Sequence, residues 1–425
     1  MGRVFRCVCW GVFLTVVFAR VSVAQRPLSW EEVRQRFEAN NPNLRAGQLG
    51  IDESKANEIT AYLRPNPQAS IGVDQIGHNS KGLFSQAVVI SSLSYLHERR
   101  HKRELRLESA KEATDITVSG QADLERTLLF ELRGAFVQTL QAKAILDLAK
   151  ENLKYYDHFL DLNRERYKAG GMAKIDMQRL DLQRVQYESD LQTAEVNLIT
   201  AKVQLLLLLN DSTNPEQFDV AGPFDFARTI PPRDAVRQAA LDARPDLRAA
   251  LQAVIKAKTD HQLAVANGST DPTINVDAAF PGVSLDYGNY TPFLHQYVGV
   301  GFSIPLRIFD RNQGEKLRTQ IDIDRNQRFT EAAKAQVLSD VDSAHATVNS
   351  TILLLQPYKD HYLQESTEVR DSIEFAYEHG AASLIDYLNA QAEYRSVQVN
   401  YLNLIGSYLT AASQLNLAVG REVIQ

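Results

Sequence analysis

The sequence predicts an α+β membrane protein in which long coiled-coil helices form a tunnel and short strands contribute to a transmembrane β-barrel shared between chains. Three observations predict this fold. The chain repeats itself once, it contains proline-poor stretches of helical periodicity longer than any ordinary globular helix, and two pairs of alternating strands interrupt those stretches.

The N-terminal 24 residues have the features of a secretory signal. Arg3 and Arg6 precede an apolar run over residues 7–19, and the small residues 22–24 (SVA) follow it. We therefore expect cleavage after residue 24 and export from the cytoplasm. Arg20 lies unusually late for a signal, so retention as an uncleaved anchor is the alternative.

The mature chain is expected to be acidic and free of cysteine. Cys7 and Cys9 both fall in the signal, which leaves neither a disulfide nor a diacyl anchor. Removing the three arginines of the signal changes the formal net charge from −6 to −9, which argues against nucleic acid as a partner. No later stretch approaches the roughly 18 consecutive apolar residues of a spanning helix, so a membrane crossing would use strands.

A duplicated unit organises the mature chain. Residues 33–35 (VRQ) recur at 236–238 and residues 42–46 (PNLRA) recur as 245–249 (PDLRA), both at an offset of 203. Tyr167 to Asp176 corresponds to Tyr377 to Asp386 at an offset of 210. Because the two offsets are so close, we divide the chain into a first repeat, 25–220, and a second repeat, 221–425, with the same fold.

Three main helices are predicted in the first repeat, at 43–64, 98–168 and 174–209, besides a short one at 30–39. The longest is proline-free and, at 1.5 Å per residue, would be a rod on the order of 100 Å. The two shorter helices, stacked end to end, would line it. A helix at 30–39 and the linker 210–232 would bridge the remaining length as a belt.

The second repeat has the same plan, with helices at 246–266, 310–378 and 384–419. Its longest helix contains Pro357, which has no counterpart in the first repeat. An interior proline removes a backbone hydrogen bond and costs about 3 kcal/mol, so we expect a kink or break there.

Each repeat also contributes one predicted strand hairpin, 68–77 with 85–95 and 273–280 with 296–304. One face of each strand is apolar and the other polar, which suits a tilted transmembrane strand beside a water-filled lumen; a soluble hairpin is the alternative. Four strands cannot close a barrel, and an open edge in lipid leaves backbone groups unpaired. Several chains must therefore share one barrel.

These features together resemble the TolC-like outer-membrane efflux family over essentially the whole mature chain. The most specific elements are 166–176 and 377–386, which are similar to the two helical-hairpin tips of that family. The resemblance implies a homotrimer with a twelve-stranded barrel in the outer membrane of a Gram-negative bacterium and a twelve-helix tunnel across the periplasm. The implied function is the duct of a tripartite efflux or secretion system.

The resemblance also implies the partners. They are a periplasmic adaptor (membrane fusion) protein, an inner-membrane pump of RND or ABC type, and outer-membrane lipid. Gly170 and Gly380 at the tips would be the docking points, because a glycine permits the tight reversal and leaves room for a partner's side chains.

Four further tip residues are assigned to a periplasmic gate or latch by the same resemblance. Asp386 would face the pore at the closed periplasmic mouth, and Asp176 would bond Tyr377 of a neighbouring hairpin. Asn389 stands where a second acidic ring residue can occur, and Ala382 where a locking arginine can occur, so we expect a weaker latch. Helix capping by the two aspartates is the alternative.

Two other functions are compatible with parts of the sequence. Residues 97–101 (HERRH) match the H-E-x-x-H zinc-protease motif, with His97 and His101 as ligands and Glu98 as base. Neighbouring cations would repel a metal and no third ligand is clearly spaced for it, so we interpret the run as a basic cluster near lipid headgroups and keep the zinc protease as the alternative. A periplasmic coiled-coil scaffold or adaptor would share the helices but not the strands. No catalytic residue, cofactor or metal is expected.

Overall fold

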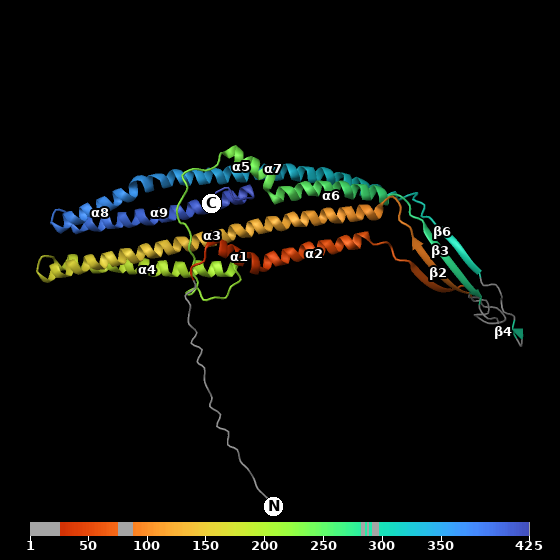
Figure 1. Cartoon of the computed structure of the whole chain (residues 1–425), viewed down its shortest axis with the longest axis horizontal. Helices are drawn as coiled ribbons and strands as arrows, with labels where there is room; N and C mark the ends of the chain where they lie inside the picture. Colours follow the sequence, from red (N-terminus) through yellow and green to blue (C-terminus); the bar gives the residue numbers. More distant parts are fainter. Residues whose placement is uncertain (1–25, 75–87, 282–284, 287–288, 291–296, 425) are drawn as a thin grey trace, which may run out of the picture.

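The computed structural model describes residues 26–74, 88–281, 285–286, 289–290 and 297–424. The expected signal with both cysteines, and parts of three predicted strands (75–77, 85–87 and 296), lie outside these ranges. The described helices form an elongated layer, as Figure 1 shows. The strands lie at one end of it, and the two turns that connect antiparallel helices lie at the other.

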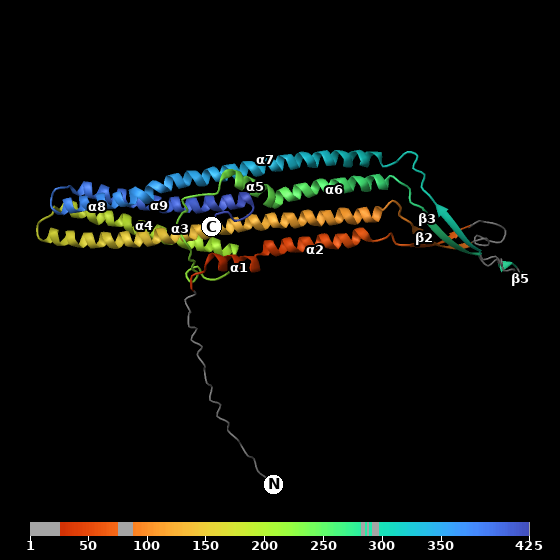
Figure 2. The same ribbon diagram turned by 45° about the horizontal axis from the view of Figure 1, so that its top comes forward.

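The first half is built around one uninterrupted helix, α3 (Lys102–Lys168), of 67 residues. The shorter helices α2 (Pro42–Tyr62) and α4 (Lys174–Leu208) pack along it one after the other, as predicted (Figure 2). Helix α1 (Trp30–Asn40) lies beside the junction between them. Asn41 separates α1 from α2, because its side chain caps the new helix whose first residue is Pro42.

Helix α3 begins at Lys102, later than the predicted position 98. Arg100 and His101 adopt positive φ angles of 59° and 54°, a left-handed conformation that a right-handed helix cannot include. The five residues between Leu96 and Lys102 therefore form a turn between the strand and the helix.

The second half repeats the arrangement with an interruption. Helices α5 (Arg233–Ala243), α6 (Pro245–Asn267) and α9 (Leu384–Val419) correspond to α1, α2 and α4. The counterpart of α3 is divided into α7 (Gln313–Pro357), a π-helical turn (Tyr358–Tyr362) and α8 (Leu363–Glu378). The interruption predicted near Pro357 in the helix 310–378 is therefore present. Proline and π-turns are both recognised causes of irregularity in a long helix, and here they are adjacent.

Four antiparallel strands form one sheet in the order β1–β2–β3–β6. The strands β1 (Gln68–Asp74) and β2 (Val88–Leu96) are the first predicted hairpin, and β3 (Thr273–Pro281) and β6 (Tyr297–Ser303) are the second. Pairing of β2 with β3 joins the two halves. The two-residue strands β4 (Leu285–Asp286) and β5 (Asn289–Tyr290) pair separately. Strands β1 and β6 are the edges of the four-stranded sheet.

The register of the sheet collects apolar side chains on one face. Val89 lies opposite both Val73 and Phe280, and Val276 lies opposite both Leu93 and Val300. Ser92 and Asp277 pair on the other face. The apolar face is solvent-accessible in the single chain; Val298 and Phe302 on β6 are 74% and 71% exposed. Among the described residues, no helix is both long and apolar enough to cross a membrane.

Candidate functional site

The predicted site lies at the end of the helical layer farthest from the sheet, where α3 turns into α4 and α8 into α9 (Figure 1). Gly170 and Gly380 reverse the chain there with φ angles of +77° and +75°, a conformation that strongly favours glycine. No heavy atom lies within 4 Å of a Cβ built on either glycine, their immediate surroundings excepted. Both turns are therefore accessible to a partner.

Asp386 is the acidic member of a capping box at the start of α9. Its Oδ2 accepts hydrogen bonds from the Ser383 backbone N (3.0 Å) and Oγ (2.6 Å), and its own backbone N donates to Ser383 Oγ (3.2 Å). The side-chain and backbone hydrogen bonds from Ser383 hold the pKa of Asp386 below its ordinary value. The capping role expected as the alternative for Asp386 is thus present, and its carboxylate is also exposed and charged.

Asp176 is placed differently although it occupies the equivalent position. The residue at the N-cap of α4 is Ala173, which has no side chain able to cap, so no capping box forms. Asp176 is partly exposed, and its Oδ1 lies 4.0 Å from Nη1 of Arg179. On α9, Asn389 is exposed and three residues from Asp386, so these two share one helix face.

Tyr377 belongs to the packing between the two helical hairpins. Its hydroxyl donates to Asn163 Oδ1 on α3 at 3.4 Å, and the described contacts within one chain do not include a hydrogen bond to Asp176. Burial, opposed by the charge of Arg166 and reinforced by that of Asp176, raises the pKa of Tyr377. Asp176 therefore lies close enough to Tyr377 to interact electrostatically.

An aromatic cluster that was not predicted from the sequence joins the hairpins behind these tips. Phe159 on α3 stacks on Tyr387 on α9 with ring centroids 4.0 Å apart, and Tyr156 stacks on Tyr187 of α4 at 4.4 Å. Tyr156 and Tyr387 are fully buried, which raises the pKa of both hydroxyls. The signal was present as aromatic residues at helical spacing, but spacing does not show which helix they face.

Two polar contacts also cross between the hairpins. Arg395 of α9 donates to Asp190 Oδ2 of α4 at 2.9 Å, and its guanidinium lies 4.3 Å from the ring centre of Tyr187. On the other side, the Tyr155 hydroxyl donates to Glu374, whose pKa is raised by burial. The two hairpins are therefore coupled by ionic as well as aromatic contacts.

The H-E-x-x-H segment does not form a zinc-protease site. That motif requires two histidines on one face of a helix, whereas His97 and Glu98 precede α3 and His101 is its N-cap. Glu98 is already engaged, since its Oε2 accepts from Arg106 Nη2 at 2.9 Å. Within the described ranges, no group of three or more His, Cys, Asp or Glu could hold a metal ion.

The basic cluster beside this segment mainly connects the two halves of the chain. Lys102 is buried, and its Nζ donates to Asp271 Oδ2 at 2.5 Å and to the Ser269 carbonyl at 3.1 Å. Arg99 donates from its backbone N to Asp271 Oδ1 at 3.0 Å and from Nε to the Thr270 carbonyl at 2.9 Å. Arg100 remains exposed.

Comparison with known proteins gives one consistent result. A family model described as "Outer membrane efflux protein" matches residues 33–211 and 236–421, one match in each half. The cobalt-zinc-cadmium resistance protein CzcC of Cupriavidus metallidurans is 21% identical over 413 residues, covering 97% of this chain and 94% of CzcC. The outer membrane protein TolC of Escherichia coli is 23% identical over 411 residues, covering 92% and 81%.

Solved structures have the same fold. A crystal structure of CusC superposes with a TM-score of 0.78 at 18% identity and covers 92% of each chain. The open state of the MtrE outer membrane channel of Neisseria gonorrhoeae superposes with a TM-score of 0.74 at 18% identity, covering 92% and 89%.

Proposed function

We infer the role of each part of this protein from one premise: the chain belongs to the outer membrane efflux protein family. It is an efflux channel located in the outer membrane and extending into the periplasm, and it works together with partner proteins. The helices α2, α3, α4 and α6 to α9 build the tunnel wall, and the four-stranded sheet is the chain's share of the barrel. The edge strands and outer helices of each chain would mediate assembly. The helical-hairpin tips would mediate docking and gating.

The assembly proposed is a homotrimer in which β1 of one chain pairs with β6 of the next. The observation that carries it is the sheet itself, which has an apolar face and two open edges. An open edge in lipid leaves backbone groups unsatisfied, and β1 and β6 run in opposite directions, so they can pair antiparallel around a closed ring.

Exposed apolar residues on the outer helices support the same assembly. Packing places α2 and α7 at opposite edges of the helical layer near the sheet, and α4 and α8 at opposite edges near the tips. Each of these helices carries large apolar side chains that are at least 49% exposed: Leu49, Ile59, Leu182, Val185, Val196, Leu317, Ile321, Phe329, Val369 and Phe375. Such faces would be covered if each edge packed on the opposite edge of the next chain.

Cysteine crosslinking tests the trimer. Ile71→Cys on β1 and Val300→Cys on β6 place thiols on the same sheet face of the two edge strands. Treatment of the double variant in outer-membrane fractions with a short bismaleimide should give a species of three chains under denaturing conditions. Each single variant serves as the control and should stay monomeric there. Dimers that never extend to a closed trimer would overturn the proposal.

The tips are proposed as the docking and gating region. Gly170 and Gly380 would receive the periplasmic adaptor, and an inner-membrane pump of RND or ABC type would act through that adaptor. Asp386 and Asn389 would line the periplasmic mouth, and Asp176 would meet Tyr377 there. Support comes from the accessible glycine turns, the exposed charge of Asp386 and the shared face of Asp386 and Asn389. Outer-membrane lipid would contact the apolar face of the sheet.

A further inference from the structure

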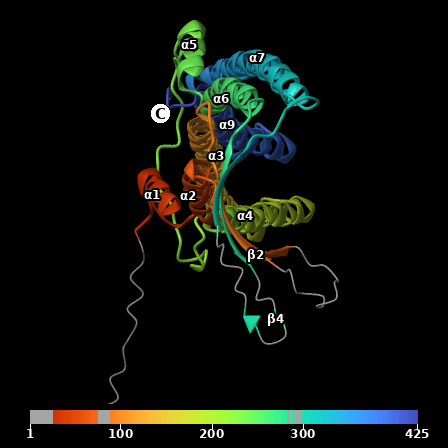
Figure 3. The same cartoon turned by 90° about the vertical axis from the view of Figure 1, so that its right-hand side faces the viewer.

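A pocket midway along the molecule has no part in the channel function described above. It has a volume of about 290 Å³ and lies between α1, α3, the end of α9 and the segment Gly420–Ile424. Figure 3 shows α1, α5 and the C-terminus on the same side of the helical layer. The pocket is remote from both the sheet and the hairpin tips.

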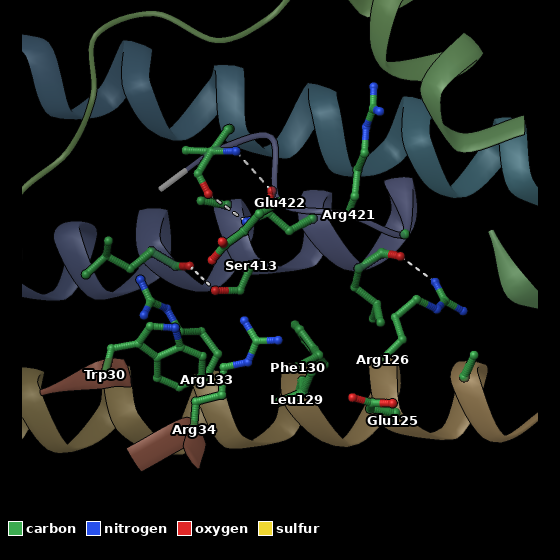
Figure 4. A pocket seen from close by; sticks show the side chains of 17 residues that line it. Trp30, Arg34, Glu125, Arg126, Leu129, Phe130, Arg133, Ser413, Arg421 and Glu422 are labelled. Carbon is green, nitrogen blue, oxygen red and sulfur yellow. Dashed lines mark hydrogen bonds between the residues drawn. The ribbon is translucent and has the colours of Figure 1, made fainter. Parts of the chain in front are cut away.

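The apolar part of the pocket is formed by Trp30, Leu129, Phe130 and Leu409. Figure 4 shows Trp30 and Arg133 together at one end of the pocket and Arg126 at the other. The volume of about 290 Å³ leaves room for a small organic molecule. This suits a small ligand with a single apolar side chain and is at the lower limit of usual ligand sites.

Two cations that line this pocket, Arg421 and Arg133, have no ion-pair or hydrogen-bond partner among the described residues. Arg421 is exposed, whereas Arg133 is partly buried. Its guanidinium lies over the Trp30 ring, 4.4 Å from the centroid, and it makes no hydrogen bond or ion pair with any of the described residues. Arg34 and Arg126, which also line the pocket, are engaged with Glu38 at 2.7 Å and Asp123 at 3.0 Å. A guanidinium held on an aromatic ring keeps its planar donors free for a carboxylate.

A carboxylate faces the same pocket without reaching Arg133. Glu422, in the segment after α9, lines the pocket, and its charge acts on Arg133. The ion pairs among the described residues nevertheless include none between Glu422 and Arg133 within 4.0 Å. The lining also contains a second carboxylate without a partner among the described residues, Glu125. Arg133 and Glu422 nevertheless offer opposite charges in one pocket, and a ligand that carries both charges would complement them.

We propose that this pocket binds an apolar α-amino acid in its zwitterionic form. The ligand carboxylate contacts the Arg133 guanidinium, its ammonium group contacts Glu422, and its side chain packs on Trp30, Leu129 and Phe130. A monovalent anion would leave Glu422 facing a like charge, and a neutral apolar ligand would leave Arg133 unpaired. Both are therefore expected to bind more weakly than the zwitterion.

The test uses the purified full-length protein in detergent and three probes of matched shape. Binding of leucine, leucinamide and N-acetylleucine is measured by saturation-transfer NMR and by titration. Leucine should bind, and each of the two blocked probes should bind roughly tenfold more weakly, because each lacks one of the charged contacts. Absence of leucine binding, or equal binding of all three probes, would overturn the proposal.

Variants assign the two contacts. Arg133→Gln should reduce leucine affinity roughly tenfold, and Glu422→Gln should abolish the preference for leucine over N-acetylleucine. Lys150→Gln is the matched control: it removes an exposed cation from α3, the helix that carries Arg133, at a position outside the pocket lining. Arg133→Lys keeps the charge if Arg133→Gln disturbs folding, and it should retain part of the affinity. Unchanged binding in Arg133→Gln and Arg133→Lys would place the ligand elsewhere.

Discussion

Arg395 of α9 and Asp190 of α4 form a hydrogen-bonded ion pair of 2.9 Å that connects the two helical hairpins of one chain. The Arg395 side chain is only 16% exposed and lies over Tyr187, so the pair is shielded more than a surface ion pair. Opening the periplasmic end by separating the hairpins would have to break this contact. It is therefore a residue-level point at which the proposed gate can be tested.

Arg395→Ala should loosen the gate. Removing the guanidinium deletes the ion pair and its contact with Tyr187, and we expect the closed arrangement to lose about 1–3 kcal/mol. In planar bilayers this should appear as larger or more frequent conductance than in the wild type. Arg164→Ala is the control, because Arg164 is exposed and its ion pairs with Asp161 and Asp181 stay within one hairpin. Equal conductance of the Arg395→Ala variant and the wild type would contradict the role.

Asp386→Ala should reduce block of the channel by cations applied from the periplasmic side. The carboxylate is exposed and charged, and three copies in a trimer would create a cation site at the mouth. Ser383→Ala serves as the control for capping, since it removes the cap and retains the charge. If Ser383→Ala and Asp386→Ala have the same effect on block, capping rather than charge would explain it.

Cation block should also depend on pH in a defined direction. The hydrogen bonds from Ser383 lower the pKa of Asp386. Its carboxylate is therefore fully charged at any pH above the ordinary aspartate pKa, and it becomes neutral only as the pH falls through the lowered pKa. Block should therefore persist down to about pH 4. In Ser383→Ala the loss should begin at higher pH. A midpoint well above pH 5 in the wild type would contradict the assignment.

Gly170→Ala and Gly380→Ala should weaken the turns, and larger residues should also hinder a partner. Both glycines have positive φ, so alanine is expected to destabilise each turn by about 1 kcal/mol although no atom obstructs its Cβ. Gly170→Leu should in addition reduce co-purification with a crosslinked adaptor. Gly50→Ala on α2 is the control, as that site is equally open and helical. If Gly170→Leu and Gly380→Leu both co-purify with the adaptor as well as the wild type does, the two glycine turns are not the docking points.

Tyr387→Ala should destabilise the contact between the hairpins by about 3–5 kcal/mol, because it removes a fully buried ring that stacks on Phe159 at 4.0 Å. Limited proteolysis near the tips and thermal unfolding measure this. Tyr387→Phe retains the ring and loses only a hydrogen bond of 3.2 Å accepted from Gln391, so it should cost about 1 kcal/mol. Similar losses in both variants would show that the hydroxyl, rather than the stacking, is decisive.

The sequence by itself determined the repeated architecture. Periodicity gave α4 and α9 their starting residues at Lys174 and Leu384, and Pro357 located the interruption between α7 and α8. The strand alternation predicted both hairpins because a period of two assigns every second side chain to one face. These features depend on neighbours along the chain, so a single sequence contains the information.

The tertiary structure alone decided which residues meet across elements. The contacts of Arg395 with Asp190, of Phe159 with Tyr387 and of Lys102 with Asp271 join residues more than 150 positions apart. No local pattern fixes such pairs, because helical spacing selects a face but not the helix that covers it. The H-E-x-x-H segment shows a second limit of spacing. Its spacing matches one turn of helix, but Arg100 and His101 adopt left-handed conformations and belong to the turn that precedes α3.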